Sequence, residues 1–307
     1  MDKSRRFWKT PGFRLFLLTV PFLVLIFIFS YLPLNGWRYA FYDYRAGMKL
    51  SDVPFVGLKY FRQIFGSSIR LRDIARVMKS TLGMSFLGIL TSPLPMLFAI
   101  MLYEMRSTGY RRIVQTLTTL PNFISWVLVY SVAYSMFSVG DGFINRVLVN
   151  TGLIESEINF LASRDNVWIT QWAYGTWKSL GWNAVMYLAA LTGIDQSLYE
   201  AARVDGAGRW DVILHIELPG LLPTFFVLLL LSIANIINNG MEQYYVFANA
   251  MNKQSIEVLD LYVYNQGLGG NQIPYATAVG MLKSVISITL LAVANTTSKL
   301  VRGESIV

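Results

Sequence analysis

Six long stretches with almost no charged residues limit what this chain can fold into more than any other feature of its sequence. They are Leu15–Leu34, Thr81–Tyr103, Ile113–Val139, Trp168–Leu191, Leu218–Met241 and Ala278–Thr297, and only Lys178 and Lys283 interrupt them. A helix needs roughly 20 mostly apolar residues to cross a bilayer core about 30 Å thick, because lipid offers the backbone no hydrogen-bond partners. The sequence therefore predicts an all-α membrane protein with six transmembrane helices.

The overall composition agrees with this prediction and excludes several kinds of chemistry. Hydrophobic residues make up 54% of the 307 residues, and charged residues make up only 14%, against about 25% in soluble domains. The sequence has no cysteine and a single histidine, His215, so disulfide bonds, thiolate metal sites and cysteine nucleophiles are impossible. We expect no catalytic residue, no metal site and no nucleic-acid partner in this chain.

The basic residues near the ends of the spans indicate how the chain is oriented. Residues 1–14 carry five Lys/Arg residues, namely Lys3, Arg5, Arg6, Lys9 and Arg14. The apolar run that follows is longer than that of a cleaved signal peptide, so we predict a retained first span. Lysine and arginine are equally numerous on the two sides, with twelve on each, but charges close to the span ends dominate orientation.

From these charges we predict a multi-pass protein of the cell membrane with both termini in the cytoplasm. Residues 1–14 form a basic cytoplasmic tail, and residues 15–307 form a single transmembrane domain. Its long first outer loop covers residues 35–79, and a cytoplasmic loop at 192–219 joins the fourth and fifth spans.

The loop at 192–219 carries the most informative pattern in the chain. It predicts two short helices around a glycine turn, with Ser197 and Glu200 as a capping box and Gly206 as the left-handed residue after the first helix. Trp210, Ile213 and Leu214 have the spacing of one helical face, and Pro219 is expected to restart the chain into the fifth span.

This loop resembles a known motif at every fixed position. The sequence Glu200-Ala201-Ala202 is followed by three residues, Gly206, nine residues, and then Ile216-x-Leu218-Pro219. That is the spacing of the EAA loop in binding-protein-dependent ABC importer permeases. Other segments resemble the polysaccharide-type branch of the sugar permeases: YLPLNGWRYAFYDY (31–44), VGLKYF (56–61), LPNFISWVLV (120–129), Gly181–Pro223 and YATAVGMLKSV (275–285).

The resemblance implies a permease subunit of an ATP-driven importer of oligo- or polysaccharides. It implies four kinds of partner: a second, homologous permease, two ATPase subunits, an extracytoplasmic solute-binding protein and the saccharide. It also implies that the EAA helices dock on an ATPase subunit, which makes Glu200, Ala201, Ala202, Gly206, Ile216, Leu218 and Pro219 the ATPase-coupling residues. For Glu200, helix capping alone is the competing interpretation.

The chain itself has no nucleotide-binding motif. Lys79-Ser80, Lys178-Ser179 and Lys283-Ser284 all lack the preceding glycines of a phosphate-binding loop. We therefore expect no cofactor on this chain and no enzymatic activity of its own, with ATP and Mg²⁺ bound by the ATPase subunits.

Polar and aromatic residues within the spans are the candidates for a substrate pathway, since such groups are costly in lipid. Four fall at intervals of four along the third span, where they predict one helical stripe. At the end of the fifth span, Asn235, Asn239 and Glu242 are expected to share a face with Asn238. The full set is Asn122, Trp126, Tyr130, Tyr134, Lys178, Trp182, Asn235, Asn239, Glu242 and Lys283. Interfacial aromatic belts, hydrogen bonds between helices and a snorkelling Lys283 are the competing interpretations.

The first outer loop is strongly basic, with nine Lys/Arg residues between Arg38 and Lys79. It is either a solvated surface or a site that attracts an acidic binding protein or an anionic oligosaccharide. Three other functions stay open: an ABC permease for another solute class, a secondary transporter and a membrane-embedded enzyme. The last two require paired intramembrane acids or convergent catalytic groups, and among the span residues only Glu242 stands out as an acid.

Overall fold

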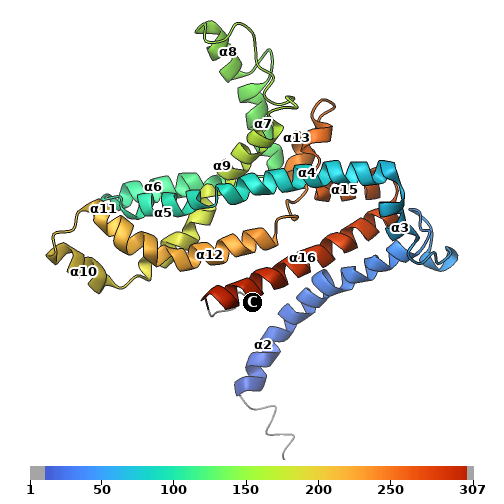
Figure 1. Cartoon of the computed structure of the whole chain (residues 1–307), viewed down its shortest axis with the longest axis horizontal. Helices are drawn as coiled ribbons and strands as arrows, with labels where there is room; N and C mark the ends of the chain where they lie inside the picture. The colour runs from blue at the N-terminus through green and yellow to red at the C-terminus, as the bar shows by residue number, and fades with distance from the viewer. Residues whose placement is uncertain (1–10, 303–307) are drawn as a thin grey trace, which may run out of the picture. The chain divides into compact units, whose positions relative to one another are not determined.

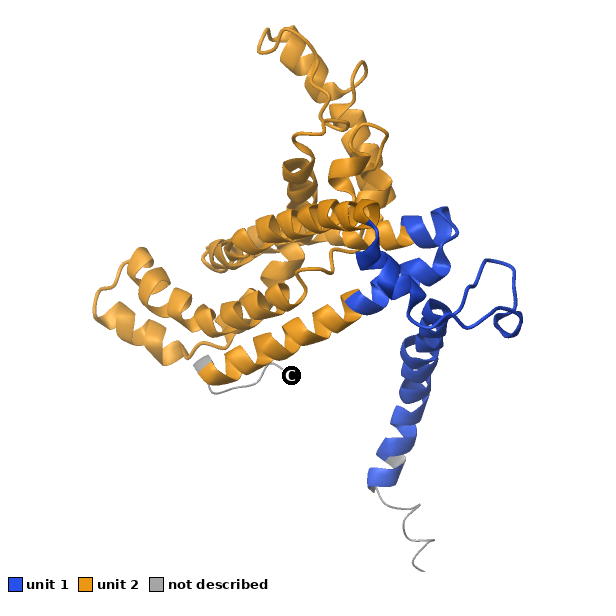
Figure 2. Ribbon diagram, turned by 45° about the vertical axis from the view of Figure 1, so that its right-hand side comes forward, with its two compact units in different colours: residues 1–67, 265–282 blue, residues 68–264, 283–307 orange. Residues whose placement is uncertain are grey.

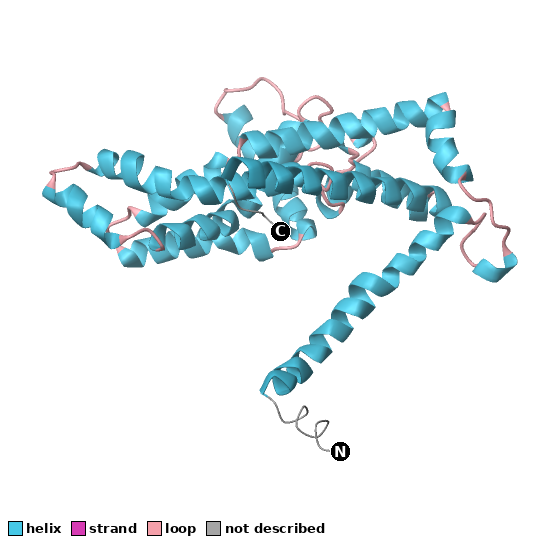
Figure 3. Cartoon of the chain, turned by 60° about the horizontal axis from the view of Figure 1, so that its bottom comes forward, coloured by secondary structure: helices cyan, strands magenta, loops and turns pink. Residues whose placement is uncertain are grey.

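The structure, a computed structural model, describes residues 11–302, so Lys3, Arg5, Arg6 and Lys9 of the predicted basic tail lie outside the described residues. Within this part the chain consists of helices joined by loops (Figure 3). It has no β-strand there, only an isolated bridge between Tyr42 and Phe55. The predicted all-α class is confirmed.

The chain divides into two compact units, residues 1–67 with 265–282 and residues 68–264 with 283–307 (Figure 2). The helices of the first unit are α2 (Pro11–Ile26), η1 (Phe27–Tyr31), η2 (Leu32–Phe41), η3 (Leu50–Asp52), α3 (Lys59–Gly66), η6 (Asn265–Gly269) and the first part of α16 (Ile273–Arg302). In this unit Asp43 accepts hydrogen bonds from the Tyr60 hydroxyl at 2.5 Å and from Lys59 at 3.1 Å. These bonds hold the pKa of Asp43 below its usual value.

The second unit, orange in Figure 2, contains most of the helices. They are α4 (Ser68–Leu90), α5 (Pro93–Tyr103), α6 (Thr108–Thr119), η4 (Leu120–Phe123), α7 (Trp126–Phe137), α8 (Phe143–Asn150), α9 (Val167–Thr192), α10 (Gln196–Val204), α11 (Arg209–Val212), η5 (Ile213–Glu217), α12 (Leu218–Ala234), α13 (Glu242–Phe247), α14 (Lys253–Ile256), α15 (Leu259–Tyr264) and the rest of α16.

Helix α9 is the centre of this unit, because α4, α5, α6 and α12 all pack against it. Gly181 allows α6 to approach closely, since a Cβ at this position would lie 2.3 Å from the Thr118 carbonyl oxygen. Tyr187 and Leu191 of α9 are buried in a cluster with Ile100 of α5 and Leu221 of α12. The packing thus fixes the start of α12, which follows the loop with the EAA pattern.

Four helices of the described chain are long and apolar enough to cross a membrane: Leu15–Phe41, Ser68–Tyr103, Arg209–Ala234 and Ile273–Leu300. They overlap the first, second, fifth and sixth predicted spans. Helix α9, the fourth predicted span, has 26 residues. It is long enough to cross a membrane, but its polar residues make it less apolar than the four helices above. The count of six spans stays a prediction, while the multi-pass membrane character is clear from these helices.

The third predicted span is not one helix. The segments Thr108–Phe123 and Trp126–Phe137 meet at an angle of 107°. Pro121 lacks a backbone N–H, and its ring disfavours continuation of the preceding helix. Ser125 then starts α7, because its side chain accepts a hydrogen bond from the backbone N–H of Leu128 at 3.4 Å. The prediction of a continuous stripe from Asn122 to Tyr134 is therefore wrong.

The fifth predicted span is also shorter than expected. Helix α12 ends at Ala234, and Asn235 turns its side-chain amide back to the carbonyl of Leu231 at 2.9 Å. Asparagine side chains compete with the backbone in this way at helix ends, and Gly240 follows with a φ of +75°. Glu242 belongs to the next helix, α13. The prediction that these polar residues share one helical face is therefore wrong.

Candidate functional site

The segment with the EAA pattern folds as a helical hairpin, formed by α10 and α11 (Figure 1). Gly206 has a φ of +75°, which confirms the predicted left-handed residue. The N–H of Ala207 donates to the carbonyl of Ala202 at 2.9 Å, and the N–H of Gly206 donates to Arg203 at 3.2 Å. These bonds close the first helix as a Schellman-type turn. The glycine thereby sets the direction in which α11 leaves.

The start of the hairpin differs from the prediction. Asp195, rather than Ser197, caps α10, because its carboxylate accepts a hydrogen bond from the Ser197 N–H at 2.9 Å. The bond to the Ser197 backbone holds the pKa of Asp195 below its usual value. The predicted capping box of Ser197 and Glu200 is therefore wrong, and Glu200 has an exposed side chain. This removes the competing capping role and leaves the carboxylate accessible to a partner.

The end of the hairpin continues directly into the membrane helix. Arg209–Ala234 is a single helical segment, so the prediction that Pro219 restarts the chain is wrong. Pro219 would clash with the carbonyl of His215 in a regular α-helix, and a π-helical turn at Ile213–Glu217 accommodates it. The second helix of the hairpin and α12 are thus parts of one continuous helix, so a movement of the hairpin can be passed directly to α12.

The predicted coupling residues are brought together on this hairpin and the first turn of α12. Glu200, Ala201, Gly206 and Pro219 are exposed, whereas Ala202, Ile216 and Leu218 are half-buried. Two large apolar side chains of the hairpin, Val204 and Trp210, are 88% and 74% exposed. Exposed apolar groups on a polar hairpin form a surface suited to protein contact.

Residues of three elements meet where the hairpin joins α5, and the sequence alone did not point to them. Arg209 of α11 pairs with Glu104 just after α5, with 2.5 Å between Nε and Oε2. The Tyr199 ring of α10 lies 6.5 Å from the ring of Tyr103. Burial raises the pKa of Tyr199 above its usual value, and the nearby Glu217 acts in the same direction.

Glu217 is the most unusual residue of this cluster. Its side chain is 0% exposed, and neither carboxylate oxygen receives a hydrogen bond from another described residue. It interacts electrostatically with both Glu104 and Arg209. Buried carboxylates without a donor are costly, so Glu217 destabilises the folded chain unless a proton or another group compensates for its burial.

In the predicted pathway, Lys178 has a definite structural role. Its ammonium group donates to the carbonyls of Pro121 at 3.0 Å and Asn122 at 2.7 Å. It also lies 5.5 Å from the centre of the Trp126 ring. The Pro121 carbonyl also accepts a hydrogen bond from the Ile124 N–H at 3.2 Å. A lysine side chain commonly adds a donor to the last carbonyls of a helical segment. Lys178, Asn122 and Trp126 therefore come together at the break in the third predicted span.

The other aromatic candidates divide between core and surface. Tyr130 packs edge-on against Phe247 at 5.1 Å between ring centres and belongs to a hydrophobic cluster. Tyr134 is exposed, with its ring 6.2 Å from that of Tyr130. Trp182 is also exposed and meets the edge of Phe123.

The amide candidates of the fifth span connect elements rather than lie free. The Asn239 amide donates to the Ser85 hydroxyl of α4 at 2.8 Å, and Asn238 donates to Ser287 of α16 at 3.1 Å. Asn235 accepts a hydrogen bond from Asn238 at 3.2 Å. Glu242 is exposed at the start of α13.

Lys283 forms an ion pair with Asp260 of α15. The same carboxylate accepts a hydrogen bond from the Gly240 N–H at 2.9 Å. Lys283 thus joins α16 to α15 and to the turn after α12. Asp260 is absent from the candidates predicted from sequence, because it lies between the fifth and sixth apolar stretches and adjoins neither of them.

A cavity of about 620 Å³ lies among α4, α9, α12 and α13. Trp126 and Asn235 line it, but the other eight predicted pathway residues do not. Most of its polar lining comes from positions that sequence reasoning did not select, among them Ser85, Gln171, Asn183 and Gln243. Gln243 donates to both the backbone and the side-chain oxygen of Gln171, at 2.7 and 3.0 Å. Hydroxyl and amide groups of this kind suit hydroxyl-rich ligands.

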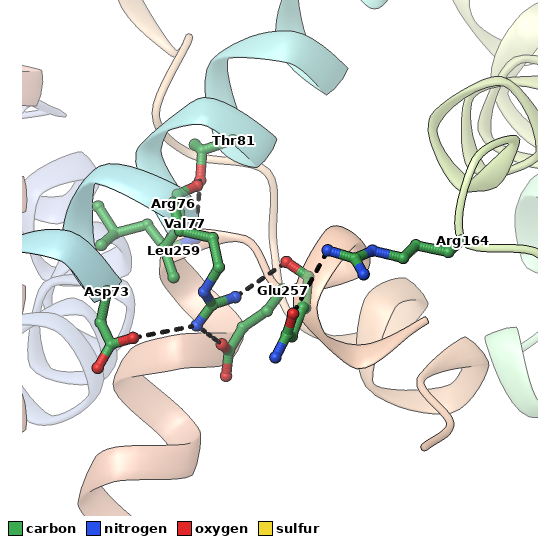
Figure 4. A network of polar contacts seen from close by, with 8 residues as sticks. Asp73, Arg76, Val77, Thr81, Arg164, Glu257 and Leu259 are labelled. Atoms are coloured by element: carbon green, nitrogen blue, oxygen red, sulfur yellow. Dashed lines mark hydrogen bonds and ion pairs between the residues drawn. The ribbon is translucent and has the colours of Figure 1, made fainter. Parts of the chain in front are cut away.

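Arg76, one of the nine basic residues from the predicted outer loop, belongs to a network of polar contacts (Figure 4). Arg76 of α4 pairs with Glu257 at 2.8 Å and with Asp73 at 3.9 Å, and it donates to the carbonyl of Gln254. Thr81, one turn along, accepts a hydrogen bond from the Leu259 N–H at 2.8 Å. This network fastens α4 to the segment before α15. Arg76 is therefore a structural residue of this network.

Comparisons with known proteins identify a family. Residues 91–302 match the family model described as the binding-protein-dependent transport system inner membrane component. Protein LplB of Bacillus subtilis is 37% identical, over 93% of this chain and 88% of its own length. The polygalacturonan/rhamnogalacturonan transport system permease protein YteP of the same organism is 36% identical, over 95% and 89%.

A solved structure agrees with these relatives. A chain of a bacterial ABC transporter involved in the import of the acidic polysaccharide alginate is 32% identical, with a TM-score of 0.84, over 97% of this chain and 99% of that one. The same TM-score relates this chain to that alginate transporter in complex with a periplasmic protein bound to an alginate pentasaccharide. This chain belongs to the family of binding-protein-dependent transport system inner membrane components, the permeases of ABC importers.

Proposed function

We propose that this chain is the permease subunit of an ATP-driven importer of oligo- or polysaccharides. The observation that carries the proposal is the exposed α10–α11 hairpin with the complete EAA pattern, in a chain of this family. A rigid helical pair that continues into α12 can pass on a rigid-body movement, whereas a flexible loop cannot. Two ATPase subunits bind ATP and Mg²⁺ and move this hairpin, and the chain itself catalyses no reaction.

The chain forms half of the translocation pathway, and a second, homologous permease forms the other half. An extracytoplasmic binding protein delivers the saccharide. In the proposed orientation both termini and the hairpin face the cytoplasm, and residues 35–79 lie outside. Residues 15–307 act as one transmembrane domain.

The saccharide class is supported by the names of the relatives and by the chemistry of the chain. YteP is named for polygalacturonan and rhamnogalacturonan, and another relative, AraP of Bacillus subtilis, is named for arabinooligosaccharides at 25% identity. Half-buried Trp126 and exposed Trp182 offer aromatic faces for sugar rings, and Asn235, Gln243 and Asn183 offer amides for hydroxyl groups.

The assembly can be tested by purifying the tagged chain from its native host in mild detergent and identifying what accompanies it. We expect a second permease with an EAA loop and an ATPase with a phosphate-binding loop. When the tagged chain carries Glu200→Ala, we expect less ATPase but the same amount of the second permease to co-purify with it. A stable complex that contains neither protein would contradict the proposal and favour a secondary transporter.

A further inference from the structure

The junction between the hairpin and α5 contains an arrangement that the EAA pattern does not describe. Arg209 is the first residue of α11, and Glu104 directly follows α5, 105 positions earlier in the chain. The two are joined twice: Nε meets the Glu104 carboxylate at 2.5 Å, and an Nη2 hydrogen donates to the Glu104 backbone carbonyl at 2.9 Å. The second bond fixes the backbone at the end of α5 as well as the side chain.

This double contact is suited to transmitting movement rather than to stabilising the fold. The Arg209 side chain is 58% exposed, and exposed ion pairs contribute little to stability. Its planar guanidinium nevertheless holds two acceptors in fixed directions. Asp211 in turn accepts a hydrogen bond from the Gly208 N–H at 2.9 Å, so the helix start that carries Arg209 is itself ordered.

Helix α5, whose end is held by Arg209, leads into the centre of the second unit. The last residues of α5 include the buried Ile100 and Leu102, and α5 packs along α9. A displacement of α11 therefore acts on α5 through Arg209, in addition to acting on α12 through the continuous helix.

We propose that Arg209 and Glu104 are positioning residues that form a clamp, through which movement of the coupling hairpin reaches α5. The proposal rests on the proposed function, because it requires an ATPase that moves the hairpin. Without the clamp the hairpin still docks and still leads into α12, but α5 no longer follows it. ATP hydrolysis then continues with little transport.

The test uses the full transporter in proteoliposomes with its binding protein and an oligosaccharide that this protein binds. Glu104→Gln and Arg209→Gln should each lower the amount transported per ATP hydrolysed by about tenfold, the effect of 1.4 kcal/mol. The melting temperature and the amount of bound ATPase should stay near those of the wild type. Arg106→Gln removes an exposed charge two residues from Glu104 and serves as the matched control with unchanged coupling.

A charge swap separates positioning from a general structural role. Glu104→Arg combined with Arg209→Glu should recover a large part of the coupling, though not all, because the bond to the backbone carbonyl is lost. Wild-type coupling in both single variants, or a double variant no better than either, would overturn the clamp.

Hydrogen exchange of the permease alone tests the contact without any ATPase. Glu104→Gln should speed exchange of the amides at 209–212, whereas unchanged exchange would overturn the clamp even in a correct transporter. A wild-type permease that binds no ATPase would instead overturn the proposed function, and with it the role of the clamp.

Discussion

The left-handed backbone at Gly206 makes the hairpin sensitive to a single substitution. Proline fixes φ near −65° and cannot adopt the φ of +75° found here. We expect Gly206→Pro to reduce saccharide uptake by about tenfold or more while membrane insertion is retained, because α11 would leave α10 in a different direction. Uptake by cells and the amount of protein in the membrane fraction measure the two effects.

The control at this position is Gly206→Asn, since asparagine tolerates left-handed backbone. An added Cβ would meet no atom within 4 Å, so this variant should keep most of the uptake. Normal uptake by Gly206→Pro would show that the direction of α11 is unimportant for transport.

Glu217 provides a second prediction at the scale of one residue. Its carboxylate is fully buried and receives no hydrogen bond from the described residues, with Glu104 nearby. Glu217→Gln has nearly the same shape and adds a donor that can bond to Glu104. We expect it to stabilise the protein by about 1 kcal/mol, measured as a higher melting temperature in detergent. A lower melting temperature, with Glu217→Asp as the comparison, would mean that the charge itself is needed.

At the scale of elements, the bend in the third predicted span depends on Lys178. Lys178→Met removes two hydrogen bonds from a charged donor to the carbonyls of Pro121 and Asn122. We expect a loss of about 2 kcal/mol in stability, as for bonds that involve a charged group. Thermal unfolding of the purified chain measures this loss, and Lys178→Arg, which keeps the donors, should lose less. Unchanged stability combined with lost uptake would instead support a direct role in the pathway.

The elements show how far sequence patterns can predict this fold. Apolar length predicted helices at all six stretches, because the requirement for a satisfied backbone in lipid depends on composition alone. The breaks at Ile124–Ser125 and Asn235 depend on local competition from Pro121 and from asparagine side chains. Such competition is decided by tertiary partners, among them Lys178 and Ser85, that a hydropathy pattern cannot reveal.

The sites show the same division. The EAA spacing predicted the position of the hairpin and the conformation of Gly206, because both are local in sequence. Glu104 and Asp260 could not be predicted, because only the folded chain shows their ion pairs. Glu104 pairs with Arg209, and Asp260 pairs with Lys283, each on a helix distant in sequence.

At the scale of the whole molecule, the chain has a net charge of +8, and basic residues on the predicted outer side would attract an anionic saccharide if it were the substrate. Arg38, Arg45, Lys49 and Arg62 are exposed in the first unit. If the saccharide carries carboxylates, changing these four residues to Gln should raise the substrate concentration needed for half-maximal uptake by about fivefold. The effect should fade above 0.15 M salt, where charges are screened beyond about 8 Å. Lysine at the three arginine positions is the control, and identical salt dependence in all variants would contradict this role.

The central claim is that this chain imports saccharides only as part of an ATP-driven assembly. The most direct measurement is uptake of a labelled oligosaccharide into proteoliposomes that contain this permease with its co-purified partners, with ATP inside and binding protein outside. We predict uptake that requires the ATP, the binding protein and the second permease together. Uptake by this chain alone, or uptake driven by an ion gradient without ATP, would contradict the account.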